Sequence, residues 1–209
     1  MPTRAMGDDG GSTPVPTGVA MRDARRQLFD AAERILLRDG PDALTSRAVT
    51  AEADCAKGVL HRHFADFDAF LVELVLDRIA RVEAQTAELR AAAGTGTVAG
   101  NLADALTALF GSVAVAIVSL ITFRDELRVR LRRIRPPGVP LATEAVATVA
   151  SYLAAERDLG RIAADADVDT LALTLVGSAH LMSAGREDGL PEPGAVLKVV
   201  NSVIAGAVV

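Results

Sequence analysis

A run of seven residues, 57–63, carries most of the side chains that could bind a nucleic acid. It reads KGVLHRH and combines two cations, two imidazoles, a glycine and a valine. On a 3.6-residue helical period, Leu60 and Phe64 share one stripe, while Gly58 and Arg62 lie opposite. Cationic side chains bind guanine edges and phosphates, glycine permits close approach, and an apolar side chain can contact a thymine methyl. The pattern predicts a short helix whose outer face meets the major groove.

The elements around this run must be compact, because a helix-turn-helix motif uses its first helix to brace the second against DNA. Residues 44–71 fit a short helix, a turn at 54–56, a recognition helix at 57–63 and the start of a longer helix. Thr45 or Ser46 can cap the short helix, and Asp66 can cap the longer one. Upstream, a helical stripe predicts one more helix, which Gly40-Pro41 ends; its members are Leu28, Ala32, Ile35 and Leu36.

This segment resembles the DNA-binding head of the TetR-type repressors. The family pattern looks like LT-x-R-x-[IV]-A-x-x-A-G-V-S-K-G-T-L-Y-x-H-F-x-S-K-E-x-L. The chain matches it at Leu44, Thr45, Arg47, Val49, Ala53, Lys57, Gly58, Leu60, His63, Phe64 and Leu71. Motif-level resemblance covers roughly residues 25–71. It implies an all-α protein with an N-terminal three-helix helix-turn-helix head and a C-terminal helical bundle for ligand binding and dimerisation.

The resemblance implies that the outer faces of the two short helices contact DNA. The expected contacts are Thr45, Ser46, Arg47, Lys57, Gly58, Val59, His61, Arg62 and His63. Several positions depart from the family pattern and bear on affinity and base preference rather than on the fold. Asp54 replaces the turn glycine, Ala56 a serine, Val59 a threonine, His61 a tyrosine and Phe67 a lysine. Asp accepts a left-handed backbone better than most residues.

The net charge of the chain does not by itself favour binding to DNA. The net charge is −5, and residues 21–66 hold eight Lys/Arg and eight Asp/Glu. A positive field must therefore come from local placement. The cations expected to supply it are Arg25, Arg26, Arg47, Lys57 and Arg62.

Three domains are expected from the composition: a flexible tail at 1–20, the helix-turn-helix domain at 21–66, and a regulatory and dimerisation domain at 67–209. The tail is rich in Gly, Pro and Ser and has no apolar core of signal-peptide length, so a cytoplasmic location is expected. One cysteine excludes a disulfide within the chain.

Residues 67–209 show a helical pattern of apolar residues along their whole length. We expect a long helix from Asp66, a break at 94–97, helix from 101 to about 135 with an interruption near Ser119, and a break at 136–140. We then expect a helix at 142–157 and another that Asp165 or Asp167 caps and that runs to about 184. A loop at 185–193 and a last helix at 195–207 complete the pattern.

Residues 105–123 form a stretch of nineteen uncharged residues, which is long enough to span a bilayer. Six arginines follow between Arg124 and Arg135, as they would on the cytoplasmic side of a span. A buried core helix explains the same composition and agrees better with the surrounding helices, so no membrane contact is expected. A membrane-anchored helical protein stays as an alternative, as does a second nucleic-acid surface on the arginine run.

The last two helices are too apolar for a monomer, which predicts a homodimer built through them. A twofold dimer also agrees with two recognition helices that read a palindrome. Between the head and these helices, the family places an effector cavity. Its candidate lining residues here are Phe110, Phe123, Tyr152 and His180. The scarcity of aromatic and charged groups favours a small apolar effector, although each of these residues is also an ordinary core residue.

No enzyme, cofactor or metal is expected. Cys55 has no general base that the sequence places beside it, and His61 and His63 point apart on a helix. The sequence therefore predicts a DNA-binding transcriptional regulator: a homodimeric repressor of palindromic operators, relieved by an effector of unknown identity. Besides the membrane-anchored protein, the other alternative is a helical protein-interaction module that no longer binds DNA.

Overall fold

The computed structural model describes residues 18–110, 113–184 and 194–209, and every regular element in these ranges is helical. In chain order the elements are α1 (Gly18–Asp39), η1 (Pro41–Ala43), α2 (Ser46–Glu52), α3 (Gly58–His63), α4 (Phe67–Ala91), α5 (Val98–Phe110), α6 (Ala114–Phe123), α7 (Asp125–Ile134), α8 (Ala142–Asp158), α9 (Val168–Ser183) and α10 (Ala195–Ile204). One isolated bridge joins Ile162 to Val208 near the C-terminus. The predicted all-α class is confirmed.

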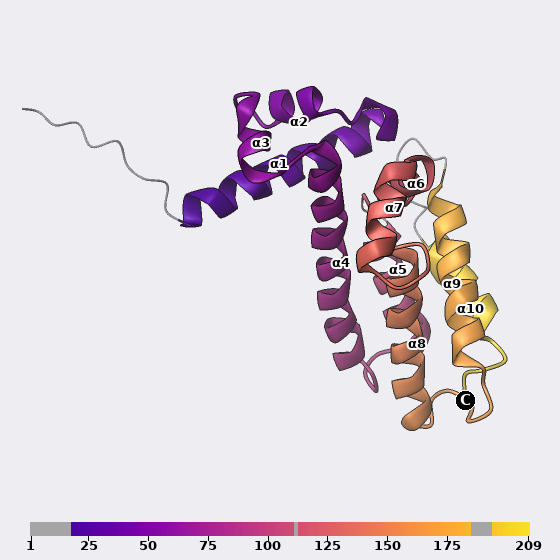
Figure 1. The fold of residues 1–209 in the computed structure, drawn as a ribbon. Coiled ribbons are helices and arrows are strands. Elements are labelled where there is room, and N and C mark those ends of the chain that lie inside the picture. The colour runs from indigo at the N-terminus through magenta and orange to yellow at the C-terminus, as the bar shows by residue number, and fades with distance from the viewer. Residues whose placement is uncertain (1–17, 111–112, 185–193) are drawn as a thin grey trace, which may run out of the picture.

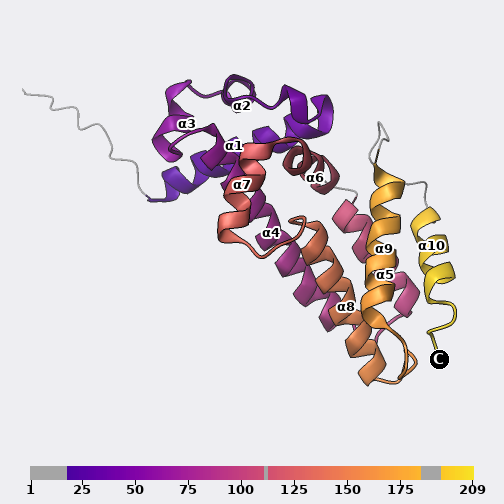
Figure 2. The same cartoon turned by 45° about the vertical axis from the view of Figure 1, so that its right-hand side comes forward.

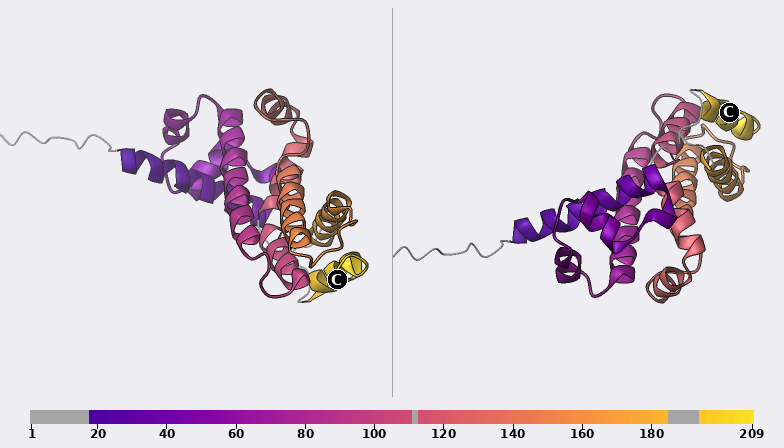
Figure 3. Two further views of the ribbon diagram at one scale, coloured as in Figure 1. Left: turned by 90° about the horizontal axis from the view of Figure 1, so that it is seen from below. Right: turned by 90° about the horizontal axis from the view of Figure 1, so that it is seen from above.

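The helices form a head and a bundle that share α4 (Figure 1). Helices α1, α2 and α3 make the head, and α4 starts there and runs along the bundle. Helix α8 packs between α4 and α9, and α10 packs on α5 and α9 at the outer edge (Figure 2). Seen from below and from above, the head projects to one side of the bundle (Figure 3). Helices α6 and α7 lie where the head and the bundle meet.

An apolar core holds the head on α4. The predicted stripe on α1 is buried; Leu28, Ala32, Ile35 and Leu36 are each at most 2% exposed. Three phenylalanines from different elements pack together, with centroid separations of 5.8 Å between Phe29 and Phe64 and 5.1 Å between Phe64 and Phe70. Aromatic packing of this kind fixes orientation as well as burying area. It therefore sets how the head sits on the start of α4.

Three helices begin at side-chain caps that the sequence indicates. The hydroxyl of Thr45 accepts a hydrogen bond from the Ala48 N–H at 3.1 Å, so Thr45, not Ser46, caps α2. Asp66 accepts from the Ala69 N–H at 2.7 Å and caps α4 as predicted. Asp167 caps α9 in the same way. These residues satisfy backbone donors that would otherwise lack a partner.

The apolar stretch at 105–123 is not one continuous helix. It is divided between α5 and α6, whose axes differ by 53°. No single helix in the described ranges is long and apolar enough to cross a membrane, although this bent pair reaches the length together. The predicted interruption near Ser119 is wrong, because its hydroxyl bonds to the Val115 carbonyl within α6. Helix α6 continues through Ser119 and ends at Arg124, whose backbone is extended, so the predicted helix is interrupted there and between α5 and α6.

The two ends of the chain and the loop before α10 complete the comparison with the predicted elements. Residues 1–17 of the expected tail and the expected loop at 185–193 lie outside the described residues. The last helix ends at Ile204, and the following residues turn back so that Ala163 donates to the Ala207 carbonyl at 2.8 Å.

Candidate nucleic-acid interface and ligand cavities

The turn between α2 and α3 depends on a left-handed residue. Asp54 has a φ of 48°, which confirms that Asp can occupy the position where the family pattern has glycine. The next residue, Cys55, donates its N–H to the Thr50 carbonyl at 3.0 Å and closes the turn. Burial raises the pKa of the Cys55 thiol, with a smaller contribution from the charge of Asp54. This cysteine is therefore a packing residue of the turn.

The inner side of α3 is anchored in the head. Leu60 is fully buried and Phe64 nearly so. The Arg25 guanidinium lies 4.6 Å from the centre of the Phe64 ring, donates to the His63 carbonyl at 3.3 Å and forms an ion pair with Glu73 of α4. One cation thus joins α1, the end of α3 and α4. This fixation leaves the opposite side of α3 to solvent.

The outer face carries most of the residues expected to contact DNA. Thr45, Arg47, Lys57, Gly58, His61 and Arg62 are exposed, whereas Ser46, Val59 and His63 are half-buried. A Cβ added at Gly58 would meet no atom within 4 Å, so this position is open to a close partner. Val59 packs against the core and Thr45 is engaged as a cap, so their side chains are only partly available. The structure brings all nine residues to one end of the molecule.

The near-neutral composition of the head hides an uneven distribution of charge. Arg34 and Arg38 both bind Glu52, at 2.8 and 3.0 Å. The hydrogen bond from Arg34, followed by that from Arg38, lowers the pKa of the Glu52 carboxyl. By contrast, Arg47, Lys57 and Arg62 have no ion-pair partner within the described residues. Exposed cations without a carboxylate partner among the described residues of the head therefore lie on the outer faces of α2 and α3, and Arg26 of α1 is another such cation.

The arginine run after α6 is used largely inside the protein. Arg130 of α7 binds both oxygens of Asp66, at 2.8 and 3.1 Å, and so lowers the pKa of that carboxyl; the Ala69 N–H adds to the effect. Arg124 pairs with Asp68 at 3.3 Å and lies 5.2 Å from the centre of the Phe67 ring. These contacts tether α7 to the start of α4. The sequence did not reveal them, because the proximity of α7 to α4 arises only in the tertiary structure.

An apolar cavity of about 530 Å³ opens between α5, α6, α8 and α9. Two of the four predicted ligand residues line it, Phe110 and His180, whose rings meet edge to face with centroids 6.0 Å apart. The other lining residues are Val118, Thr122, Val139, Ala142, Thr143, Val146, Leu173, Val176 and Gly177. Sequence reasoning missed most of them, because they carry no feature beyond apolar character and come from distant segments.

The other two predicted ligand residues lie elsewhere. Tyr152 is fully buried, donates to Glu156 and accepts from the Asn101 amide at 2.9 Å. Burial, and then the bond to Glu156, raises the pKa of the Tyr152 phenol. Phe123 is 83% exposed at the end of α6, beside a hollow that Leu44 and Thr45 of the head also line. The four aromatic positions therefore belong to three different places in the bundle.

Comparison with known proteins identifies the head. Residues 28–74 match the family described as bacterial regulatory proteins, tetR family. Among curated proteins, no sequence relative is found.

Solved structures match the whole fold. A gamma-butyrolactone receptor (ArpA-like protein) has a TM-score of 0.65 at 20% identity, with 90% of this chain and 89% of the receptor covered. Salmonella enterica GusR has a TM-score of 0.63 at 16% identity, covering 90% and 96%. A regulator from Saccharomonospora viridis in complex with choline has a TM-score of 0.65 at 16% identity, covering 90% and 99%. At these identities the likeness establishes the fold alone.

The head thus matches the tetR family of bacterial regulatory proteins, and the chain as a whole has the fold of solved TetR-family regulators. The family match and the fold support the general function of a DNA-binding transcriptional regulator.

Proposed function

We propose that the chain is a cytoplasmic homodimeric repressor that binds a palindromic operator and releases it when a small apolar effector enters the bundle. The proposed units are the tail at 1–20, the head at 21–66 and the regulatory domain at 67–209. The start of α4 at Phe67 supports the second boundary. The effector would act through a population shift between two arrangements of the heads.

The observation that carries the DNA-binding proposal is the set of cations on the outer face. Arg47, Lys57 and Arg62 project from α2 and α3 without a carboxylate partner among the described residues, whereas Arg34 and Arg38 of α1 both pair with Glu52. A phosphate backbone can supply the missing counter-charge, and guanine edges accept the same donors. His61 and the open position at Gly58 complete a surface with hydrogen-bonding groups and room for close approach.

The dimer proposal is supported by an exposed stripe on α9. Leu173 and Leu181 are 63% and 76% exposed, and Gly177 lies between them. Nothing would obstruct a Cβ at Gly177, so a partner helix can approach closely there. Most of the other apolar residues of α9 and α10 are used inside the chain; they include Leu175, Ala179, Val196, Val200 and Ile204. An unpartnered leucine stripe of this kind is typical of an interface between helices.

The effector proposal is supported by the apolar cavity. Its walls are aliphatic and aromatic, with His180, Thr122 and Thr143 as isolated polar groups. Such a lining suits a molecule with an apolar body and one or two hydrogen-bonding atoms. Two proteins of the same fold are described as a gamma-butyrolactone receptor and as a choline complex, so this architecture accepts small ligands.

Helix α6 gives the cavity a route to the head. Val118 and Thr122 line the cavity, and Leu120 and Phe123 on the same helix border the hollow shared with Thr45, the cap of α2. Arg124, directly after α6, contacts Phe67 and Asp68 at the start of α4. A displacement of α6 by the effector would therefore press on both α2 and α4.

Selection of bound sequences from random duplex DNA tests this proposal. The full chain should enrich an inverted repeat whose half-site centres lie about 10 bp apart or a multiple of this, as two recognition helices on one dimer require. Enrichment of a single half-site would contradict the dimeric reading. No enrichment over a matrix without protein would contradict DNA recognition and favour the interaction module.

A further inference from the structure

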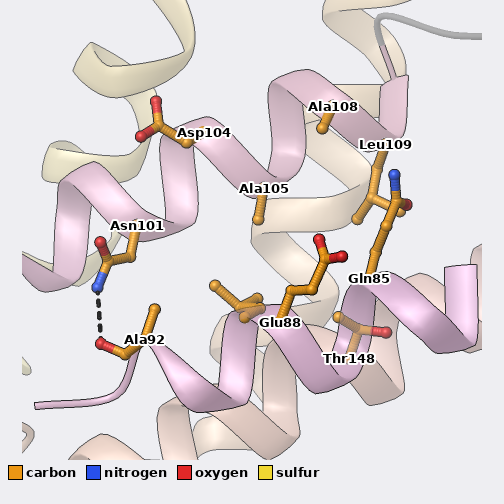
Figure 4. A pocket seen from close by; sticks show the side chains of 10 residues that line it. Gln85, Glu88, Ala92, Asn101, Asp104, Ala105, Ala108, Leu109 and Thr148 are labelled. Atoms are coloured by element: carbon orange, nitrogen blue, oxygen red, sulfur yellow. Dashed lines mark hydrogen bonds between the residues drawn. The ribbon is translucent and has the colours of Figure 1, made fainter. Parts of the chain in front are cut away.

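Side chains from neighbouring helices bind free carbonyl groups at helix ends in both the bundle and the head. In the bundle, the Asn101 amide of α5 donates to the Ala92 carbonyl at the end of α4 at 3.2 Å, beside a hollow of about 300 Å³ between these two helices (Figure 4). In the head, Arg25 of α1 donates to the His63 carbonyl at the end of α3 at 3.3 Å. Both contacts hold a helix end, and the one in the head adds a positive charge, which the C-terminal end of a helix attracts.

The recognition helix α3 depends on such contacts. It spans six residues, Gly58–His63, and the side chain of Lys57, which precedes it, caps none of its described N–H groups. A helix this short is not stable on its own in water, so neighbouring elements must hold it. The buried side chains of Leu60 and Phe64 anchor its inner side, and Arg25 holds its C-terminal end.

Arg25 also connects α3 to the long helix α4. Its Nη1 atom donates to the His63 carbonyl, its Nη2 atom binds Glu73 in the second turn of α4, and its guanidinium lies 4.6 Å from the centre of the Phe64 ring. A guanidinium is planar and presents its N–H groups in fixed directions. The position of Glu73 on α4 therefore determines where the end of α3 is held.

Two neighbouring arginines of α1 differ in what they can offer to DNA. The sequence predicts that Arg25 and Arg26 both supply positive charge to the head. The charge of Arg25 is compensated by Glu73. Arg26 is exposed and has no ion-pair partner among the described residues. Arg25 thus serves contacts within the protein, and Arg26 is a matched residue with the same charge and without these contacts.

We infer that Arg25 is a positioning residue for DNA recognition, which sets the angle of α3 from α4 and does not itself bind DNA. With the ion pair to Glu73 in place, a tilt of α4 moves the C-terminal end of α3. The proposed effector signal therefore has a direct path from α4 to the recognition helix. This inference rests on the proposed DNA binding, whereas the restraint of α3 by Arg25 exists without DNA.

The first test uses the full chain without DNA. Hydrogen exchange measured by mass spectrometry should be faster in a peptide covering residues 57–64 for Arg25→Gln and Glu73→Gln than for the parent. Protection of α8 and α9 should remain, and Arg26→Gln should match the parent. Unchanged exchange of this peptide in both variants would overturn the inference. Because no DNA is present, the result separates failure of the inference from failure of the proposed function.

The second test measures affinity for the selected duplex by fluorescence anisotropy at several salt concentrations. Arg25→Gln should weaken binding by about tenfold or more, and the slope of log affinity against log salt should stay unchanged, because no phosphate contact is lost. Arg25→Lys keeps the charge without the planar group and should restore only part of the affinity. Arg26→Gln should weaken binding by less than about threefold, through long-range charge alone. A slope reduced by about one in Arg25→Gln, or equal losses in the two glutamine variants, would overturn the inference.

Glu73→Gln separates positioning from simple charge. Loss of a carboxylate makes the head more positive, so long-range electrostatics alone would tighten DNA binding. The positioning role predicts the opposite, a loss of about tenfold, because α4 would no longer hold Arg25. Glu83→Gln is the matched control at an exposed carboxylate of α4, and it should bind at least as tightly as the parent. Binding by Glu73→Gln as tight as that of Glu83→Gln would overturn the inference.

Discussion

The head and the bundle are both held by buried apolar side chains, but they leave different groups on their surfaces. The head exposes Arg47, Lys57 and Arg62, whereas its carboxylate Glu52 pairs with Arg34 and Arg38. The bundle exposes leucines on α9 and encloses two hollows between helices. The difference separates two kinds of function. Recognition by the head follows from side chains within one short segment, whereas binding by the bundle follows from segments that meet only after folding.

The largest effect is expected from a charge placed on the bundle's exposed stripe. Leu181→Glu would bury an unpaired carboxylate in the proposed interface of each copy, at a cost of about 3–5 kcal/mol per charge. Light scattering should report a dimer for the parent and a monomer for the variant. Leu159→Glu changes a leucine that is 57% exposed away from the stripe, so it should stay dimeric. A dimer that tolerates Leu181→Glu would place the interface elsewhere.

The next effect concerns the packing of the head. Leu60 is fully buried beneath the recognition helix, so Leu60→Ala should cost about 2–5 kcal/mol. Hydrogen exchange should show lost protection in α2 and α3 with protection kept in α8 and α9. Leu37→Ala, at a residue that is 60% exposed, should change stability by less than about 0.5 kcal/mol. Equal loss of protection in head and bundle would mean that the two regions unfold as one unit.

The smallest effect tests the tether between the regions. The hydrogen bonds from Arg130 and then the Ala69 N–H lower the pKa of Asp66 in the folded protein. A lowered carboxyl pKa contributes stability above the unfolded value of about 4, and the contribution is lost as the pH falls through the folded value. Asp66→Asn keeps a capping side chain but loses the charge. Urea unfolding should show the variant to be less stable than the parent at pH 7, with the difference shrinking at about pH 3. An equal difference at both pH values would contradict the role of the ion pair.

The sequence predicted those features that depend on local chemistry. The stripe at Leu28 and Ile35, the caps at Thr45 and Asp66 and the left-handed turn at Asp54 all follow from side-chain type and spacing. These features need only residues a few positions apart, so a single segment contains the whole signal.

The ligand sites were less accessible to sequence reasoning. Phe110 and His180 meet at one cavity, but Tyr152 and Phe123 lie elsewhere, because aromatic type does not say which helices become neighbours. The pairing of α7 with the start of α4 had no local signal for the same reason. The break at Arg124 was misplaced because a serine such as Ser119 can bond to its own helix and leave it intact.

We propose above all that the cations of α2 and α3 that have no carboxylate partner read DNA. The most direct test is fluorescence anisotropy on the selected duplex with two double variants that remove the same charge. Lys57→Ala with Arg62→Ala should weaken binding by about 2–6 kcal/mol, roughly thirtyfold or more, because each lost base contact costs about 1–3 kcal/mol. Arg34→Ala with Arg38→Ala, which removes the cations paired with Glu52, should weaken it by less than about threefold through long-range charge alone. Equal losses in the two variants, or full binding by the first, would contradict the claim.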